Sequence, residues 1–369
     1  MAVAFFSIAE SYNKFHRRPF LSALAKELAK RGQSTLYFHR PQWLLKMLLK
    51  PVGEKGTCDG ILIYRLWTLL PVSWCFSSRL LMYLFVSLPV RWQVYRRIKI
   101  TGEKKHLAWL YKPDQYLYLR HLGIAYAYTH YDNYDDDKEY QFSRRSNYAS
   151  TLSACVQNSI STFATSTRLV SRLANPDKVK YLGNAIDESL LQTNQGAGST
   201  KPKPVIGFVG AIDQTTDAEL VSKLCEAFPE CDIQMIGAVH NDEINALAQK
   251  ANNLTLIGRV DYQKLIDFVG LFDVGICPYA ESPFNAYRNP LKLYEYCAFG
   301  LPAVSTGCDF DPVGRELVDI CNSEAEFIAA TRRALSEGES SKKQKRIDFA
   351  KSNTWQKRAC YVLDYLNIK

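Results

Sequence analysis

The chain has 369 residues, of which 47% are hydrophobic and 22% are charged, and its formal net charge is +9. This length suggests two domains or one large one, and the composition excludes long disordered tracts. The positive charge favours anionic partners such as phosphates or a membrane surface, but it is spread out and no nucleic-acid-binding motif accompanies it. We therefore expect no nucleic acid among the partners.

The ten cysteines point to a reducing compartment. They include no CxxC pair and no Cys/His cluster with zinc spacing. Several lie in apolar runs, where cysteine behaves as a small hydrophobic residue. We expect a cytoplasmic protein without a disulfide framework and without a bound metal.

The first half of the sequence alternates apolar runs typical of buried strands with stretches typical of helices. Val3–Ser7 is expected to form the first strand, and Pro19–Gly32 a helix with proline in its first turn and glycine at its end. Further strands are expected at residues 34–39, 60–66, 106–111 and 124–130. Strands separated by helices predict parallel βαβ units.

Two segments in this half, Pro41–Pro51 and Phe76–Lys99, mix Trp, Leu and Phe with Lys and Arg. Such segments suit a membrane interface, where the apolar side enters the headgroup boundary and the cations meet anionic lipid. The alternative is a core helix with a basic exposed face, and the two interpretations differ in whether the apolar face is exposed. No segment reaches the ~20 apolar residues of a membrane span. We expect a location at the inner face of the plasma membrane, peripheral to it.

The polar stretch Glu188–Pro204 is the best linker in the chain, because it contains Gly and Ser and ends in two prolines. The strand and helix pattern restarts after it, with strands expected at residues 204–211, 232–238, 254–258, 273–279 and 302–306. We therefore expect an α/β fold with two Rossmann-like domains, 1–190 and 203–350, that face a cleft. A last helix within 351–369 is expected to pack back on the first domain. Ligands of such sheets lie at the carboxyl ends of strands.

The segment "RNPLKLYEYCAFGLPAVST" (288–306) predicts a short helix, with Pro290 in its first turn and Gly300 at its end. Lys292 and Glu295 are three residues apart and share one face of this helix. Free N–H groups and the helix dipole favour an anion at this end. A phosphate beside Lys292 and a sugar diol beside Glu295, one turn deeper, would match a nucleoside diphosphate. The alternative is an amphipathic helix with a surface Lys–Glu pair.

Residues 272–306 resemble the donor-binding region of GT-B glycosyltransferases, in particular bacterial enzymes that build surface polysaccharides. The resemblance rests on Pro278, Tyr279, Asn289, Pro290, Lys292, Glu295, Tyr296, Ala298, Gly300 and Pro302. It implies two Rossmann-like domains, of which the second binds a sugar nucleotide. It also implies that Glu295 binds the ribose and Lys292 the diphosphate, with Tyr279 and Asn289 in the same site.

The resemblance extends to residues 162–187, 204–213 and 256–260. It implies that Gly210 lets the backbone approach the donor phosphates and that Arg259 lies near the nucleobase. The alternatives are an ordinary strand-end turn and a surface arginine. One departure is Tyr287, because many retaining members carry glutamate there. Another is the sequence "DQTTD" (213–217), which replaces an Arg-Lys pair, so Lys292 would carry more of the diphosphate charge.

The Tyr- and Asp-rich stretch Ala125–Tyr140 is the candidate catalytic region, because it follows a strand and should lie at the carboxyl end of that strand. Inverting transfer to a hydroxyl group needs a carboxylate or imidazole that accepts the proton. Asp132 is the first candidate and His130 the second; the alternative is a solvated acidic loop. His16 also follows a strand and faces either the acceptor or solvent.

These observations predict a glycosyltransferase of the hexosyltransferase type. The resemblance implies that it needs no metal and no cofactor, with the sugar nucleotide, a UDP-sugar before a GDP-sugar, as a substrate. The implied acceptor is a saccharide or a polyprenyl-linked saccharide in bacterial surface polysaccharide synthesis. Two alternatives stay open: a non-catalytic nucleotide-sugar-binding or scaffold protein of the same fold, and a sugar-nucleotide epimerase, which would need a second set of acid/base groups.

Overall fold

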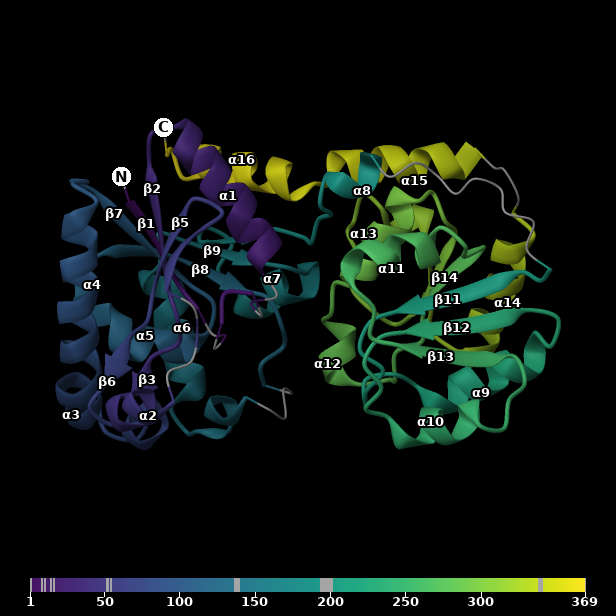
Figure 1. The fold of residues 1–369 in the computed structure, drawn as a ribbon, viewed down its shortest axis with the longest axis horizontal. Coiled ribbons are helices and arrows are strands. Elements are labelled where there is room, and N and C mark those ends of the chain that lie inside the picture. The colour runs from purple at the N-terminus through teal and green to yellow at the C-terminus, as the bar shows by residue number, and fades with distance from the viewer. Residues whose placement is uncertain are drawn as a thin grey trace. The chain divides into compact units, whose positions relative to one another are not determined.

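The computed structural model describes residues 2–7, 9, 11–13, 15, 17–50, 53, 55–135, 140–192, 202–337 and 341–368. The chain forms two compact units, shown in Figure 1. Unit 1 consists of residues 1–182 and 355–369, and unit 2 of residues 183–354. Residues 183–190, which the sequence analysis assigned to the first domain, thus belong to unit 2. Each unit is an α/β layer structure around a largely parallel sheet, so the predicted α/β class is confirmed.

Unit 1 contains an eight-stranded sheet in the order β10-β9-β8-β7-β1-β2-β5-β4. All neighbours are parallel except β4 and β5. The strands are β1 (Ala2–Phe6), β2 (Ser34–Phe38), β4 (Gly56–Cys58), β5 (Ile61–Tyr64), β7 (His106–Leu110), β8 (Ala125–His130), β9 (Ser161–Ala164) and β10 (Val179–Tyr181), and β3 (Gln42–Trp43) pairs separately with β6 (Trp67–Thr68). The central strand β1 is buried throughout, as expected of a parallel strand covered on both faces.

The helices of unit 1 are α1 (Arg18–Lys30), α2 (Leu44–Leu49), α3 (Arg79–Leu81), α4 (Leu88–Ile100), α5 (Pro113–Leu119), α6 (Tyr148–Asn158), α7 (Thr167–Leu173) and α16 (Trp355–Tyr365). The last of these, α16, lies along α1 (Figure 1). The rings of Phe20 and Trp355 are 5.9 Å apart, and Arg31 forms an ion pair with Asp364 at 2.8 Å. These contacts make the end of the chain part of unit 1. Within the described ranges, none of the helices has both the length and the apolar composition that a membrane crossing needs.

Unit 2 contains a parallel six-stranded sheet in the order β13-β12-β11-β14-β15-β16. Its strands are β11 (Val205–Val209), β12 (Asp232–Ile236), β13 (Leu254–Gly258), β14 (Val274–Cys277), β15 (Ala303–Thr306) and β16 (Asp319–Cys321). Its helices are α8 (Ser189–Gln192), α9 (Ala218–Ala227), α10 (Asp242–Ala248), α11 (Tyr262–Val269), α12 (Pro283–Ala286), α13 (Leu291–Ala298), α14 (Glu324–Leu335) and α15 (Ser341–Ser352).

The two faces of this sheet have separate cores, because successive side chains of a strand point to opposite faces. Val205 and Val209 of β11 pack in one cluster with Leu293 of α13. Ile206 and Phe208 of the same strand pack in the other cluster, which includes residues of α9 and α14. The sheet therefore packs against α13 on one face and against α9 and α14 on the other. This packing fixes the position of the first turn of α13 relative to the strands.

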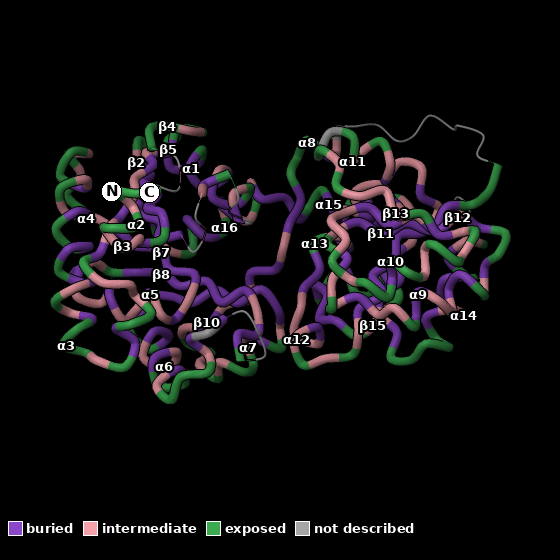
Figure 2. The backbone as a smooth tube through the Cα atoms, turned by 60° about the horizontal axis from the view of Figure 1, so that its bottom comes forward, coloured by how far each residue is buried: buried purple, intermediate pink, exposed green. Residues whose placement is uncertain are grey.

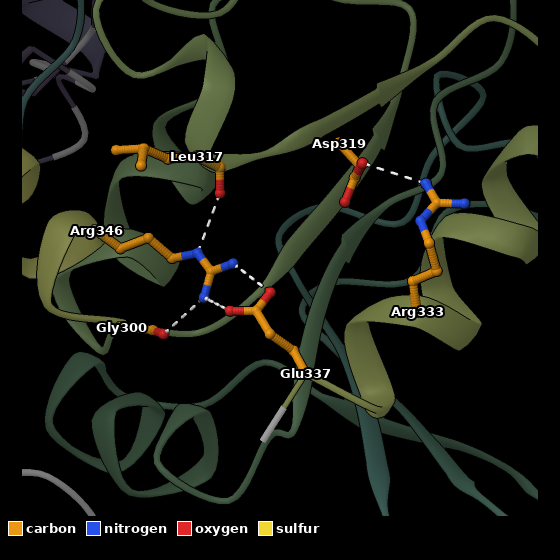
Figure 3. Close-up of polar contacts among 6 residues, drawn as sticks. All are labelled: Gly300, Leu317, Asp319, Arg333, Glu337 and Arg346. Carbon is orange, nitrogen blue, oxygen red and sulfur yellow. Dashed lines mark hydrogen bonds and ion pairs between the residues drawn. The ribbon is translucent and has the colours of Figure 1, made fainter. Parts of the chain in front are cut away.

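Arg346 of α15 anchors that helix to the end of α13 (Figure 3). Its side chain is 3% exposed and forms a bidentate pair with Glu337 at 2.8 and 2.7 Å. It also donates to the carbonyls of Leu317 and Gly300, at 3.1 and 3.3 Å. A buried guanidinium is tolerated only when its N–H groups are satisfied, as they are here, so this cluster depends on every partner.

Candidate functional site

The strand order of unit 2 reverses between β11 and β14, and ligands of open α/β sheets bind at such a switch point, beyond the carboxyl ends of the strands. Gly210 follows β11 there with φ +141°. A Cβ atom at this position would lie 2.1 Å from Cε of Lys292 and 2.4 Å from its Nζ. Glycine is therefore required both by the backbone conformation and by the space that the Lys292 side chain occupies.

Lys292 lies in the first turn of α13, and its ammonium group is held against aromatic rings. Nζ lies 5.1 Å from the ring centre of Phe208 and 5.7 Å from that of Tyr279, with the Tyr279 hydroxyl 3.5 Å away. Removal from water lowers the pKa of Lys292. It forms no ion pair within the described part of the chain. An ammonium group that is removed from water and has no ion-pair partner is stabilised when an anion binds beside it.

Glu295 is half-buried on the same helix face, one turn after Lys292. Removal from water raises the pKa of its carboxyl group to about 7, and the positive charge of Lys292 opposes that rise. The side chain makes neither a hydrogen bond nor an ion pair with any described residue. A partly exposed carboxylate without a protein partner is suited to accept hydrogen bonds from ligand hydroxyl groups.

Arg288 is a second cation at this site that the sequence analysis did not select. Its Nη1 donates to Oγ1 of Thr215 at 3.3 Å, and its guanidinium lies 4.8 Å from the ring centre of Tyr279 and 5.2 Å from that of Phe284. It has no carboxylate partner among the described residues, and its charge contributes to the lowered pKa of Lys292. Two cations that lie close together without carboxylate partners repel each other, and a bound anion would relieve that repulsion.

The loop that follows β11 explains how Arg288 reaches this place. Oδ1 of Asp213 accepts hydrogen bonds from the backbone N–H and the hydroxyl of Thr215, at 2.9 and 2.7 Å. The fixed Thr215 hydroxyl then accepts from Arg288. The sequence "DQTTD" lacks the expected Arg-Lys pair, but it positions an arginine from another loop. No spacing along the sequence signals this contact, because 73 residues separate the two side chains.

The remaining predicted donor-site residues have different surroundings. Tyr279 is 2% exposed, and its backbone N–H donates to Oγ1 of Thr306 at 2.7 Å, so its ring is fixed beside Lys292. Asn289 is buried, and its carbonyl accepts from Nδ2 of Asn184 at 2.6 Å. Arg259 is exposed at the end of β13, two strands from β11, and contacts none of these residues in the structure.

In unit 1, the two predicted catalytic residues differ in access to solvent. His130 ends β8 and is 2% exposed; its Nδ1 shares a hydrogen bond with the Tyr128 hydroxyl at 2.7 Å. Burial lowers its pKa to about 3. This neutral, enclosed imidazole suits a structural role, whereas Asp132 is half-buried and remains the stronger candidate base. His16 and the acidic residues 136–137 lie outside the described residues.

A polar pocket of about 260 Å³ opens at the carboxyl ends of β1, β2 and β7 in unit 1. Arg40, Lys112 and Asp114 supply its charged lining. Asp114 accepts a hydrogen bond from the Tyr140 hydroxyl, and Nζ of Lys112 lies 4.1 Å from the centre of the Tyr140 ring. Cations, a carboxylate and an aromatic ring in one pocket suit a hydroxyl-rich ligand. The sequence analysis missed Lys112 and Asp114 because they flank the start of a helix outside the Tyr- and Asp-rich stretch.

Comparison with known proteins finds similarity to glycosyltransferases. Residues 203–337 match the family model for glycosyl transferases group 1. A glycosyltransferase from Rickettsia africae has a TM-score of 0.69 at 12% identity, covering 99% of this chain and 97% of that chain. The protein has the GT-B fold, and the part of its second unit that matches this family model is similar to glycosyl transferases group 1. The predicted fold class is thereby confirmed.

Two further proteins are similar to this chain in fold or in sequence. Anabaena HepE, solved in complex with UDP and glucose, has a TM-score of 0.67 at 11% identity, with coverage of 100% and 99% of the two chains. The putative teichuronic acid biosynthesis glycosyltransferase TuaH of Bacillus subtilis is 28% identical over 193 residues. That match covers 50% of this chain and 47% of TuaH, so the chain spans about half the length of the curated relative.

Proposed function

We propose that the protein is a glycosyltransferase that moves a sugar from a nucleoside diphosphate sugar to a saccharide or polyprenyl-linked saccharide in surface polysaccharide synthesis. The observation that carries this proposal is the convergence of Lys292, Arg288 and the partnerless Glu295 at the switch point of unit 2. The name of TuaH supports sugar transfer in polysaccharide synthesis, and the UDP and glucose bound by HepE favour a UDP-sugar over a GDP-sugar.

In this proposal, the donor diphosphate binds at Lys292, Arg288 and the free N–H groups at the start of α13. Negative charge grows on the diphosphate as the bond to the sugar breaks, and fixed cations that are already removed from water stabilise that charge. Glu295 accepts hydrogen bonds from the ribose hydroxyls, which favour its ionised form and offset the burial that raises its pKa. Because two side chains supply the positive charge, we propose a transfer that needs no metal.

Unit 1 is proposed to bind the acceptor at the pocket lined by Lys112 and Asp114, with Asp132 as the base that accepts the proton from the attacking hydroxyl. The attacking oxygen forms the new glycosidic bond while the bond to the diphosphate breaks. A non-catalytic sugar-nucleotide-binding protein is the second candidate, because Tyr287 replaces a glutamate that many retaining relatives carry. We further propose that the protein works at the inner face of the membrane, where lipid-linked acceptors are found.

The test is release of the nucleoside diphosphate from UDP- and GDP-sugars with lipid-linked and free saccharide acceptors, with and without EDTA. Release that survives EDTA, is lost in Glu295→Ala and falls ~10²–10⁴-fold in Asp132→Asn supports an inverting, metal-independent transferase. Donor binding without release under any condition would favour the binding-protein candidate. Full activity in Asp132→Asn would remove that residue from the mechanism.

A further inference from the structure

A face of unit 1 formed by α2 and by residues 74–100 carries exposed apolar side chains. None of the residues of α2 is buried, and Leu49 is 88% exposed. The exposed large apolar residues of this region are Leu45, Leu48, Leu49, Trp74, Leu80, Leu81, Leu84, Leu88, Trp92 and Ile100. Figure 2 shows the exposed stretches along α3 and α4. The core-helix interpretation is thus wrong for α2, and a concentration of exposed large apolar side chains on a globular unit is typical of an interaction surface.

A pocket of about 500 Å³ lies within this face, between α2 and α4. Leu48, Trp67 and Trp92 form much of its apolar wall. Its positive charge comes from Lys55, Arg65, Arg96 and Arg97, and none of the described residues that line it is acidic. The pocket opens beside the carboxyl ends of β2 and β5, which are strands of the same parallel sheet as β1 and β7.

The three guanidinium groups are held in place by contacts other than ion pairs. Arg97 lies 4.7 Å from the ring centre of Tyr64, and Arg96 lies 4.9 Å from that of Trp92. Arg65 donates through Nε to a backbone carbonyl at 2.7 Å. Within the described part of the chain, none of the three pairs with a carboxylate. Stacking leaves the N–H edges of a guanidinium available, and the edges of several arginines match the oxygens of a phosphate.

We propose that this pocket binds the phosphate of a membrane lipid, with the hydrocarbon chain of that lipid along the exposed leucines of α2. A phosphate attached to a hydrocarbon satisfies both the partnerless arginines and the exposed apolar wall, whereas a free phosphate ion uses only the arginines. The lipid is either a bulk anionic phospholipid or a polyprenyl phosphate. In the second case, the saccharide of a lipid-linked acceptor would extend along the same sheet edge toward Lys112 and Asp114, a step that rests on the proposed function.

The first experiment measures binding of the full chain to vesicles of phosphatidylcholine alone, with phosphatidylglycerol, and with undecaprenyl phosphate at the same surface charge. Binding is expected only to the charged vesicles. Equal affinity for the two charged types assigns the site to bulk phospholipid, and preference for undecaprenyl phosphate assigns it to the acceptor lipid. Failure to bind either charged vesicle more tightly than phosphatidylcholine overturns the proposal.

The second experiment localises the site with two double variants of equal charge change on α4. Arg96→Gln/Arg97→Gln empties the pocket of two cations, and Arg91→Gln/Lys99→Gln removes two exposed cations outside it. Loss of two membrane-contacting cations corresponds to a roughly 30-fold loss of vesicle affinity.

Binding of soluble farnesyl phosphate, with farnesol and inorganic phosphate as comparisons, measures the affinity of the pocket itself in the absence of a charged bilayer surface.

The pocket variant is expected to lose farnesyl phosphate binding at least ~10-fold, while the control variant keeps it. Equal losses in the two variants would show that charge is spread over the face and that the pocket is not a site. Each variant should retain the melting-temperature shift that a UDP-sugar causes, which shows that the chain is folded. If that shift is absent from the wild type while lipid binding holds, the donor proposal fails and the lipid site stands.

Discussion

Replacing Glu295 with glutamine is expected to stabilise unit 2 above pH 7, although it should weaken donor binding. The pKa of Glu295 is raised from 4.5 to about 7 in the folded protein because the carboxyl group is removed from water. As the pH rises, the unfolded chain therefore loses this proton first, and folding stability falls between pH 4.5 and about 7. The difference of about 2.5 pKa units corresponds to about 3 kcal/mol.

Glutamine removes this penalty, so the variant should gain up to about 3 kcal/mol above pH 7, or up to about 10 °C in Tm for a unit of this size. The gain is an upper limit, because the variant also loses the attraction between Glu295 and Lys292. Calorimetric melting without ligand at pH 4 and pH 8 measures it: the two proteins should melt together at pH 4 and separate at pH 8. The exposed Glu281→Gln is the control and should show no such divergence. If the Glu295→Gln protein melts at or below the wild-type temperature at pH 8, the carboxyl group of Glu295 is not destabilised by removal from water in the folded protein.

Three other substitutions test the site and the fold. Arg288→Gln and Lys292→Gln should each weaken UDP-sugar binding ~10–100-fold in calorimetric titration, because each removes a charged hydrogen-bond donor. An unchanged affinity in Arg288→Gln would show that Arg288 does not replace the Arg-Lys pair that is absent from residues 213–217. Gly210→Ala should destabilise unit 2 by roughly 1–3 kcal/mol and displace the lysine, so retained donor binding would contradict the contact. Arg346→Met should destabilise unit 2 by ~3–5 kcal/mol in urea unfolding, because it removes the bidentate pair with Glu337 and the hydrogen bonds to the carbonyls of Leu317 and Gly300. A loss below ~1 kcal/mol would mean that water takes over the lost contacts.

The sequence predicted those elements whose ends are set by local chemistry. The helix expected from Leu291 to about Phe299 is observed at Leu291–Ala298, preceded by Pro290 and followed by Gly300 with φ +70°. The first helix, expected at 19–32, is observed at Arg18–Lys30. Proline and glycine act through the backbone of their own turn, so such boundaries can be read without the tertiary structure.

Contacts between distant segments could not be predicted. Arg288 reaches the proposed donor site because Thr215 holds it from the loop after β11, and no local pattern records that pairing. His130 belongs to a strand that is buried on both faces, where the absence of alternation hides which side chains reach solvent. The composition of residues 41–51 fits both a membrane interface and a core helix. Only the structure separates the two interpretations, because none of the residues of α2 is buried.

Thermal melting with UDP-, GDP-, ADP- and dTDP-sugars tests the central claim most directly, with Glu295→Ala as the control. A ligand that binds only the folded state at 100 times its Kd adds about 2.7 kcal/mol, which corresponds to several degrees in Tm. The account predicts that one nucleotide class raises the Tm of the wild type and that the shift disappears in Glu295→Ala. Absence of a shift with every sugar nucleotide at millimolar concentration, or an equal shift in Glu295→Ala, would contradict a donor site at Lys292, Arg288 and Glu295.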